Sequence, residues 1–138
     1  MGKKGFNIDP VTLRSMPFWC VGNPLGDPFG GPVLPKIDSL EVAKLLADAA
    51  KEGLIESTSF HDDDLVPWDP ERLEDDLDPK SETYAKLSAI KKVLDGAGLH
   101  INTATCGLHG HKIFRKGGLT NPDPKIRALA HRKVERLL

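Results

Sequence analysis

The sequence has little cysteine, almost no net charge and no long hydrophobic run, and each shortage excludes a class of protein. Its 138 residues include two cysteines, Cys20 and Cys106, which form neither a disulfide framework nor a zinc pattern and are expected to be free thiols. The formal net charge of −1 does not suggest a nucleic-acid partner. No apolar run approaches the ~18 residues of a membrane span, and the N-terminus has no apolar signal segment. We expect a cytoplasmic protein of one domain, with neither a membrane nor a nucleic-acid partner.

The hydrophobic pattern predicts the element order βαβαβα. Short apolar or alternating runs predict strands at 18–21, 54–60 and 99–105. Apolar stripes at helical spacing predict helices at 38–53, at 81–96 and from 123 to the C-terminus, with Asp38 and Asp123 as N-caps. Residues 1–16 are interpreted as a poorly fixed N-terminal arm, and residues 17–138 as the folded domain. Strands that alternate with helices indicate an α/β protein with a parallel sheet and right-handed crossovers.

Such a sheet is incomplete by itself. Three parallel strands with helices on one face leave two open edges and an uncovered inner face, whereas a parallel sheet is normally buried on both faces. We therefore expect Trp19, Phe60, Ile101 and Thr103 on the inner face to be covered by another copy of the chain. The sequence predicts a homo-oligomer, a dimer or larger, without fixing its symmetry.

The most informative segment is SFHDDDLVP, residues 59–67, at the end of the second predicted strand. His61 and Asp64 are well placed to meet there, so that the imidazole gives one N–H to the carboxylate and uses its other nitrogen on a substrate. In α/β proteins, chemistry gathers at that end of the strands. Two alternatives involve metals: the three consecutive carboxylates could bind Ca²⁺ or Mg²⁺, or His61 could bind a metal with His109 and His111. Consecutive carboxylates usually diverge and loop histidines are usually exposed, so both are less favoured.

The charges are unevenly distributed along the chain. Nearly every ionisable group from His61 to Asp78 is acidic, whereas the balance from Lys125 to Arg136 is basic. One interpretation is a solvated loop and a solvated helix face. The other is that the two segments meet across a subunit contact.

Four segments resemble motifs of the xylose isomerases, which are metal-dependent aldose–ketose isomerases with a TIM barrel. They are FWCVG at 18–22, DPFG at 27–30, FHDDDL at 60–65 and FRKGGLT at 114–120. The motifs follow the order of the family, and the similarity covers roughly residues 17–138. The chain thus resembles the N-terminal part of a xylose isomerase. The resemblance implies a partial TIM barrel of about three βα units, with helices on the outer face, completed by oligomerisation.

The resemblance also implies roles for individual residues. As the catalytic pair, His61 would help to open the sugar ring and Asp64 would orient His61. Four further residues would bind substrate: Trp19 on the apolar face of the sugar, Thr105 and His109 in the pocket wall, and Phe29 in the pocket of a neighbouring subunit. His109 stands where the family usually has an aromatic residue, which makes the predicted pocket more polar.

Part of the family's site has no counterpart in this sequence. The metal-binding carboxylates and the catalytic lysine of the family lie on later strands, so no metal ligand is assigned and no cofactor is expected. Mg²⁺, Mn²⁺ or Co²⁺ would enter only if the full site were rebuilt. We expect a truncated, self-associating xylose isomerase-like protein that is inactive alone and has a sugar as a possible ligand. The alternative is an aldose–ketose isomerase whose site is completed by other chains or by a C-terminal part.

Overall fold

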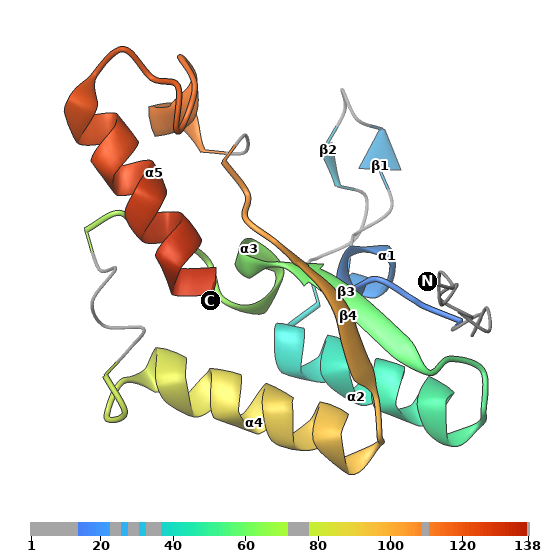
Figure 1. The fold of residues 1–138 in the computed structure, drawn as a ribbon. Coiled ribbons are helices and arrows are strands. Elements are labelled where there is room, and N and C mark those ends of the chain that lie inside the picture. Colours follow the sequence, from blue (N-terminus) through green and yellow to red (C-terminus); the bar gives the residue numbers. More distant parts are fainter. Residues whose placement is uncertain are drawn as a thin grey trace, which may run out of the picture.

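Two parallel strands form the centre of the fold, β3 (Ser57–His61) and β4 (His100–Thr105) (Figure 1). The structure is a computed structural model and describes residues 14–22, 26–27, 31–32, 37–71, 78–108 and 111–137. Around the strands lie α1 (Phe18–Gly22), α2 (Ser39–Lys51), α3 (Asp62–Leu65), α4 (Glu82–Gly96), the 3₁₀ helix η2 (Lys112–Phe114) and α5 (Pro124–Leu137). A separate antiparallel pair is formed by β1 (Gly26–Asp27) and β2 (Gly31–Pro32). The mixed α/β class predicted from the sequence is confirmed.

The long helices begin and end where the sequence supplies caps. The Asp38 carboxylate accepts the backbone N–H of Leu40 at 2.8 Å, at the start of α2. The Ser81 hydroxyl accepts the backbone N–H of Tyr84 at 3.0 Å, at the start of α4. After α2 the chain turns at Gly53, whose φ of 69° is a left-handed conformation that glycine adopts without strain. These local signals explain why the helices predicted at 38–53 and 81–96 are confirmed.

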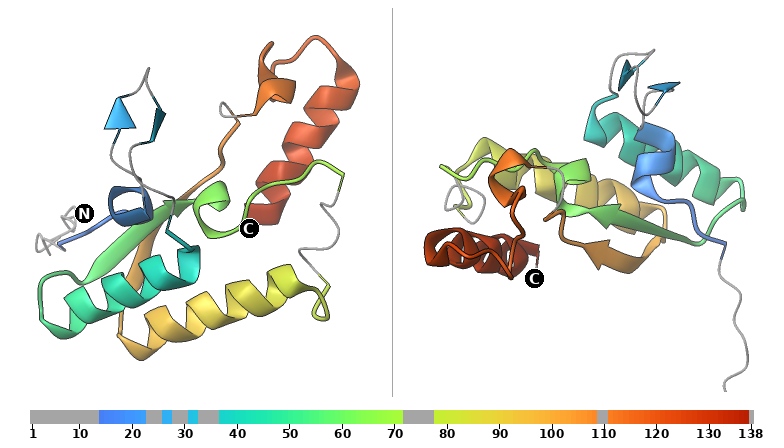
Figure 2. Two further views of the ribbon diagram at one scale, coloured as in Figure 1. Left: turned by 180° about the vertical axis from the view of Figure 1, so that it is seen from behind. Right: turned by 90° about the horizontal axis from the view of Figure 1, so that it is seen from above.

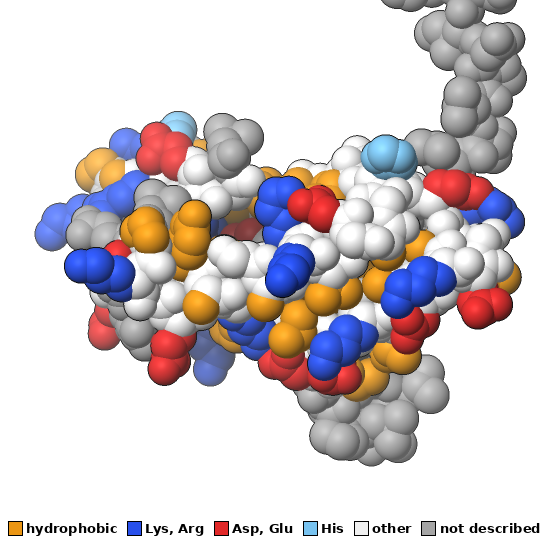
Figure 3. Space-filling view, turned by 90° about the horizontal axis from the view of Figure 1, so that it is seen from below, with side chains coloured by type: hydrophobic (Ala, Val, Ile, Leu, Met, Phe, Trp, Pro, Cys, Tyr) orange, Lys and Arg blue, Asp and Glu red, His pale blue; other side chains and the backbone are white. Residues whose placement is uncertain are grey.

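The helices α2 and α4 pack together on one side of the two strands (Figure 2). The core between these helices and the sheet is apolar, and its buried members are Phe18, Val42, Ala43, Leu46, Ile55, Phe60, Ile90, Leu94 and Leu99. Acidic and basic side chains are interspersed over the surface seen from below (Figure 3). No helix among the described residues is long and apolar enough to cross a membrane.

The predicted strand at 18–21 is wrong, because Phe18–Gly22 forms α1. Pro17 precedes the helix, and its carbonyl accepts the backbone N–H of Cys20 at 3.0 Å. Packing of Phe18 against Phe60, with ring centroids 6.3 Å apart, outweighs the strand propensity of this aromatic run. The extended segment lies earlier, where Ser15 makes a parallel bridge with Ser57. Residues 14–16, which the sequence analysis assigned to the arm, therefore lie beside β3.

One strand leaves much of its surface open. All six residues of β4 are exposed, including Thr103, and Ile101 is 52% exposed. These two residues agree with an inner face that is uncovered in a single chain, but what covers them stays a prediction. Phe60 departs from that prediction, because it is buried in the core with α2 and α4.

Candidate functional site

The C-terminal ends of β3 and β4 bring the predicted site residues to one edge of the sheet. His61 is the last residue of β3, and its register partner on β4 is Thr105. The α3 turn starts at the next residue, Asp62. Because parallel strands end at the same edge, the side chains of His61 and Thr105 and the whole acidic run lie close together.

His61 and Asp64 are in direct contact, as the spacing predicts. The Nδ1 atom of His61 lies 3.1 Å from the Oδ2 atom of Asp64, and the backbone N–H of His61 donates to the same oxygen at 2.7 Å. Because an ionised carboxylate only accepts hydrogen bonds, this contact favours the tautomer with the proton on Nδ1, in which Nε2 is the accepting nitrogen. The two side chains are 32% and 22% exposed, which leaves the pair accessible to a ligand.

The aromatic ring of Trp19 covers the imidazole. Its centroid lies 4.5 Å from that of His61, with an angle of 44° between the two planes. The α1 turn sets this position, because Phe18 is held in the core and Trp19, the next residue, points elsewhere and stays half-buried. Trp19, His61, Asp64 and Thr105 are therefore brought together at one edge. The other two predicted residues, Phe29 and His109, lie outside the described part of the chain.

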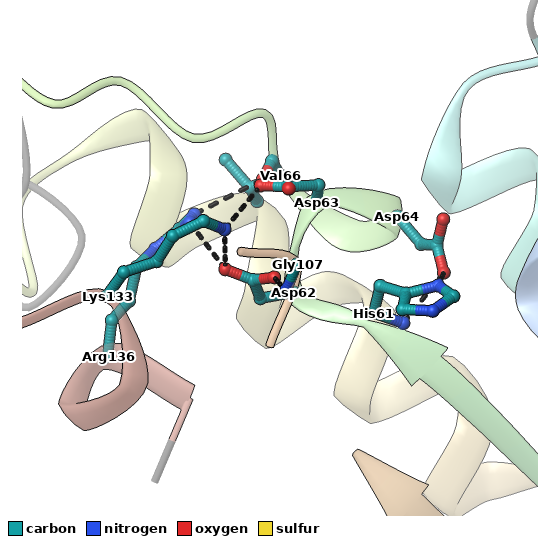
Figure 4. Close-up of polar contacts among 8 residues, drawn as sticks. All are labelled: His61, Asp62, Asp63, Asp64, Val66, Gly107, Lys133 and Arg136. Atoms are coloured by element: carbon teal, nitrogen blue, oxygen red, sulfur yellow. Dashed lines mark hydrogen bonds and ion pairs between the residues drawn. The ribbon is translucent and has the colours of Figure 1, made fainter. Parts of the chain in front are cut away.

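The three consecutive carboxylates diverge, and two of them face α5 (Figure 4). Asp62 is buried, accepts the backbone N–H of Gly107 at 2.9 Å and forms an ion pair with the Nζ atom of Lys133. Arg136 approaches the same carboxylate at 3.4 Å. Asp63 accepts from the Lys133 ammonium at 3.0 Å. The acidic and basic segments therefore meet within one chain at these four residues, and not across a subunit contact. Other charged residues of the two segments are exposed, as the solvated interpretation predicts: Asp69, Asp78, Lys125 and Arg132.

Lys133 is the residue that the sequence analysis missed. Its side chain is 0% exposed, and its ammonium lies 5.0 Å from the centre of the Trp68 ring. The signal was present in the sequence, because Lys133 occupies the stripe of α5 that also carries Ala130 and Leu137. A lysine in the middle of an apolar stripe needs a buried counter-charge.

The acidic run does not fit a divalent cation. Asp62 and Asp63 are paired with Lys133 and Arg136, and Asp64 is directed at His61, so all three carboxylates are already engaged by other side chains. Within the residues that the structure describes, no three His, Cys, Asp or Glu side chains are grouped to hold a metal ion. The alternative metal site of His61 with His109 and His111 stays untested, because His109 is not described.

Comparison with known proteins identifies relatives that cover most of this chain. The xylose isomerase of Thermus thermophilus is 35% identical over 115 residues, which are 83% of this chain and 27% of that protein. Over most of its length, this chain is similar to part of a xylose isomerase. The xylose isomerase of Thermus caldophilus is 34% identical over the same shares of the two chains. No protein-family model matches.

The resemblance to the xylose isomerases that the motifs indicate is thus confirmed. The chain spans about a quarter of the length of these curated relatives, 27% in both cases. The roles assigned to Trp19, His61, Asp64 and Thr105 remain predictions.

Proposed function

We propose that this chain supplies one side of the sugar site of a xylose isomerase-type protein and does not isomerise a sugar by itself. In this proposal Nε2 of His61 faces the ring oxygen of an aldose, and Asp64 holds the tautomer that makes this nitrogen an acceptor. Trp19 packs on the apolar face of the sugar, and Thr105 lines the pocket. The observation that carries the proposal is the His61–Asp64 contact beneath Trp19, in a chain 35% identical to a xylose isomerase.

In this proposal, the chemistry that the chain does not supply is that of a metal ion. By resemblance, a Mg²⁺, Mn²⁺ or Co²⁺ ion would act as Lewis acid on the substrate oxygens. Because Asp62 and Asp63 are paired with Lys133 and Arg136, we assign no metal ligand to the described residues and route no step through the ion. His61 and Asp64 alone can orient a sugar and move a proton, which is a small part of an isomerisation.

The proposed architecture is a partial TIM barrel with α2 and α4 on its outer face. The exposed face of β4 supports this proposal, since a parallel strand is normally buried on both faces. A second copy of the chain would cover that face, and the assembly would be a dimer or larger.

Light scattering after size-exclusion chromatography, across a dilution series, tests the assembly. We expect a molar mass of at least twice 15.1 kDa, and dissociation by Ile101→Lys, which places a charge on the 52% exposed isoleucine of β4. Leu45→Lys is the matched control, because Leu45 is 50% exposed on α2. A monomer at all concentrations would contradict the proposed self-association.

The sugar site is tested by titrating D-xylose into ¹⁵N-labelled protein. We expect shifts at the amides of residues 60–65 and 105 and at the Trp19 indole, and weaker binding in His61→Ala. Lys91→Ala, on the exposed surface of α4, is the control and should bind as the wild type does. Absence of any shift at high sugar concentration would refute the sugar site.

An isomerase assay with added Mg²⁺, Mn²⁺ or Co²⁺ separates the two candidate functions. We expect no ketose product from this chain alone. Turnover that His61→Ala abolishes would instead favour the alternative, an aldose–ketose isomerase whose site is completed by other chains or by a further segment.

A further inference from the structure

The turn that carries Asp64 is too short to hold itself. α3 has four residues, and its closing backbone bond, from the N–H of Val66 to the carbonyl of Asp62, is long at 3.4 Å. Isolated helices of this length are unstable in water, because nucleation is unfavourable. The orientation of Asp64 toward His61 must therefore depend on contacts that α3 makes with other parts of the chain.

Besides the Ser39 hydroxyl of α2, which donates to the carbonyl of Leu65 at 2.7 Å, contacts come from α5 and from the segment after β4 (Figure 4). Lys133 bridges Asp62 and Asp63, and Arg136 donates to the carbonyl of Val66 at 3.2 Å. The backbone N–H of Gly107 donates to the other oxygen of Asp62.

We propose that Lys133 is a positioning residue for His61. Its ammonium fixes the first two residues of α3 on one side, so that the third carboxylate, that of Asp64, can face only His61 on the other side. Burial makes this effect strong, because Lys133 is 0% exposed and the Asp62 side chain is 4% exposed, and charge-assisted hydrogen bonds are strongest away from water. The inference rests on the proposed function only for the role it gives to His61.

Lys133 acts on His61 through the backbone and not by direct contact. Asp62 follows His61 in the chain, and Asp64 forms two hydrogen bonds with His61, one to the ring and one to the backbone N–H. Rotation of the α3 turn would break both of these bonds together. The imidazole would then lose the acceptor that keeps its proton on Nδ1.

The experiment measures the tautomer of His61 by long-range ¹H–¹⁵N correlation, in full-length protein without sugar. We expect Nδ1–H in the wild type and a change to mainly Nε2–H in Lys133→Met, while amide shifts of α2 and α4 stay unchanged. Arg132→Met is the matched control, because Arg132 is the preceding residue of α5 and is exposed. In this variant His61 should keep its wild-type tautomer, and the signals of His100 and His131 should be unchanged.

Two results would overturn the proposal. The first is a folded Lys133→Met protein whose His61 spectrum is that of the wild type. If that variant fails to fold, Asp63→Ala replaces it, because the Asp63 side chain is 41% exposed and its removal breaks one of the two Lys133 contacts. A wild-type His61 spectrum in Asp63→Ala is the second such result. Because no sugar is present, a failure of D-xylose to bind would count against the proposed function alone.

Discussion

Replacement of the buried Lys133 should be among the most destabilising substitutions in this chain. Removing one partner of a buried ion pair leaves the other charge uncompensated and typically costs about 3–5 kcal/mol. Lys133 and Asp62 meet this condition, with side chains 0% and 4% exposed. Asp62 would keep the Gly107 N–H at 2.9 Å and Arg136 at 3.4 Å, so we expect Lys133→Met to cost about 3 kcal/mol, the lower end of that range.

Urea unfolding followed by far-ultraviolet circular dichroism gives the free energy of unfolding and its change. The matched control is Lys91→Met, which breaks an ion pair with Asp95 whose side chains are 72% and 59% exposed. Exposed pairs of this spacing contribute roughly 0.3–0.5 kcal/mol, so the two variants should differ several-fold. Equal losses of unfolding free energy in Lys133→Met and Lys91→Met would mean that the Lys133 ammonium is solvated. Lys133 would then not hold α3 in place.

The remaining predictions concern a helix cap, a close approach and a thiol. Asp38→Ala should lower the free energy of unfolding by about 0.5–2 kcal/mol at neutral pH, because it removes the α2 cap. Two hydrogen bonds, from Lys86 and from a backbone N–H of α2, hold the pKa of Asp38 below its usual range. The stability advantage of the wild type is therefore present above the unfolded-state pKa of Asp38 and should vanish as the pH falls through its lower folded-state pKa. An advantage that persists in acid would contradict this prediction. Gly107→Ala should cost about 1 kcal/mol in urea unfolding, the lower end of the overpacking range, because the new Cβ would lie 2.9 Å from the carboxylate end of the Asp63 side chain, which is 41% exposed and can shift. Gly96→Ala meets nothing and should not destabilise. Burial, and secondarily the charge of the nearby acidic turn, raises the pKa of the Cys106 thiol. Iodoacetamide should therefore label Cys106 more slowly than the exposed Cys20, as measured by mass spectrometry, and equal labelling rates would contradict this prediction.

The parts of the fold that the sequence predicted correctly are those with local signals. Asp38 and Ser81 cap helices whose apolar residues repeat at helical spacing, and Gly53 ends the first of them. Contacts within a few residues decide such features, so a single sequence contains the information. The failure at 18–21 is different, because the helix there depends on packing Phe18 against Phe60, forty-two residues away.

The candidate site divides in the same manner. His61 and Asp64 are three residues apart at a strand end, so the sequence itself shows that the two side chains are within reach of each other. The partners of Lys133 are 70 and 71 residues away in the chain, so its charge was attributed to a solvated helix face. Alternation along β3 also could not say which side of the strand the helices would cover, and Phe60 was placed on the wrong side.

The positions of the two tryptophans have a practical consequence. The sequence contains two tryptophans, and each is close to a different part of the candidate site. Trp19 lies 4.5 Å from His61, whereas Trp68 lies 5.0 Å from the ammonium of Lys133. Since indole emission depends on neighbouring groups, a pair of single-tryptophan variants would give separate optical signals for events at the imidazole and at the α5 contact. Trp19 fluorescence would therefore report ligand binding at His61, and Trp68 fluorescence would report movement of α5.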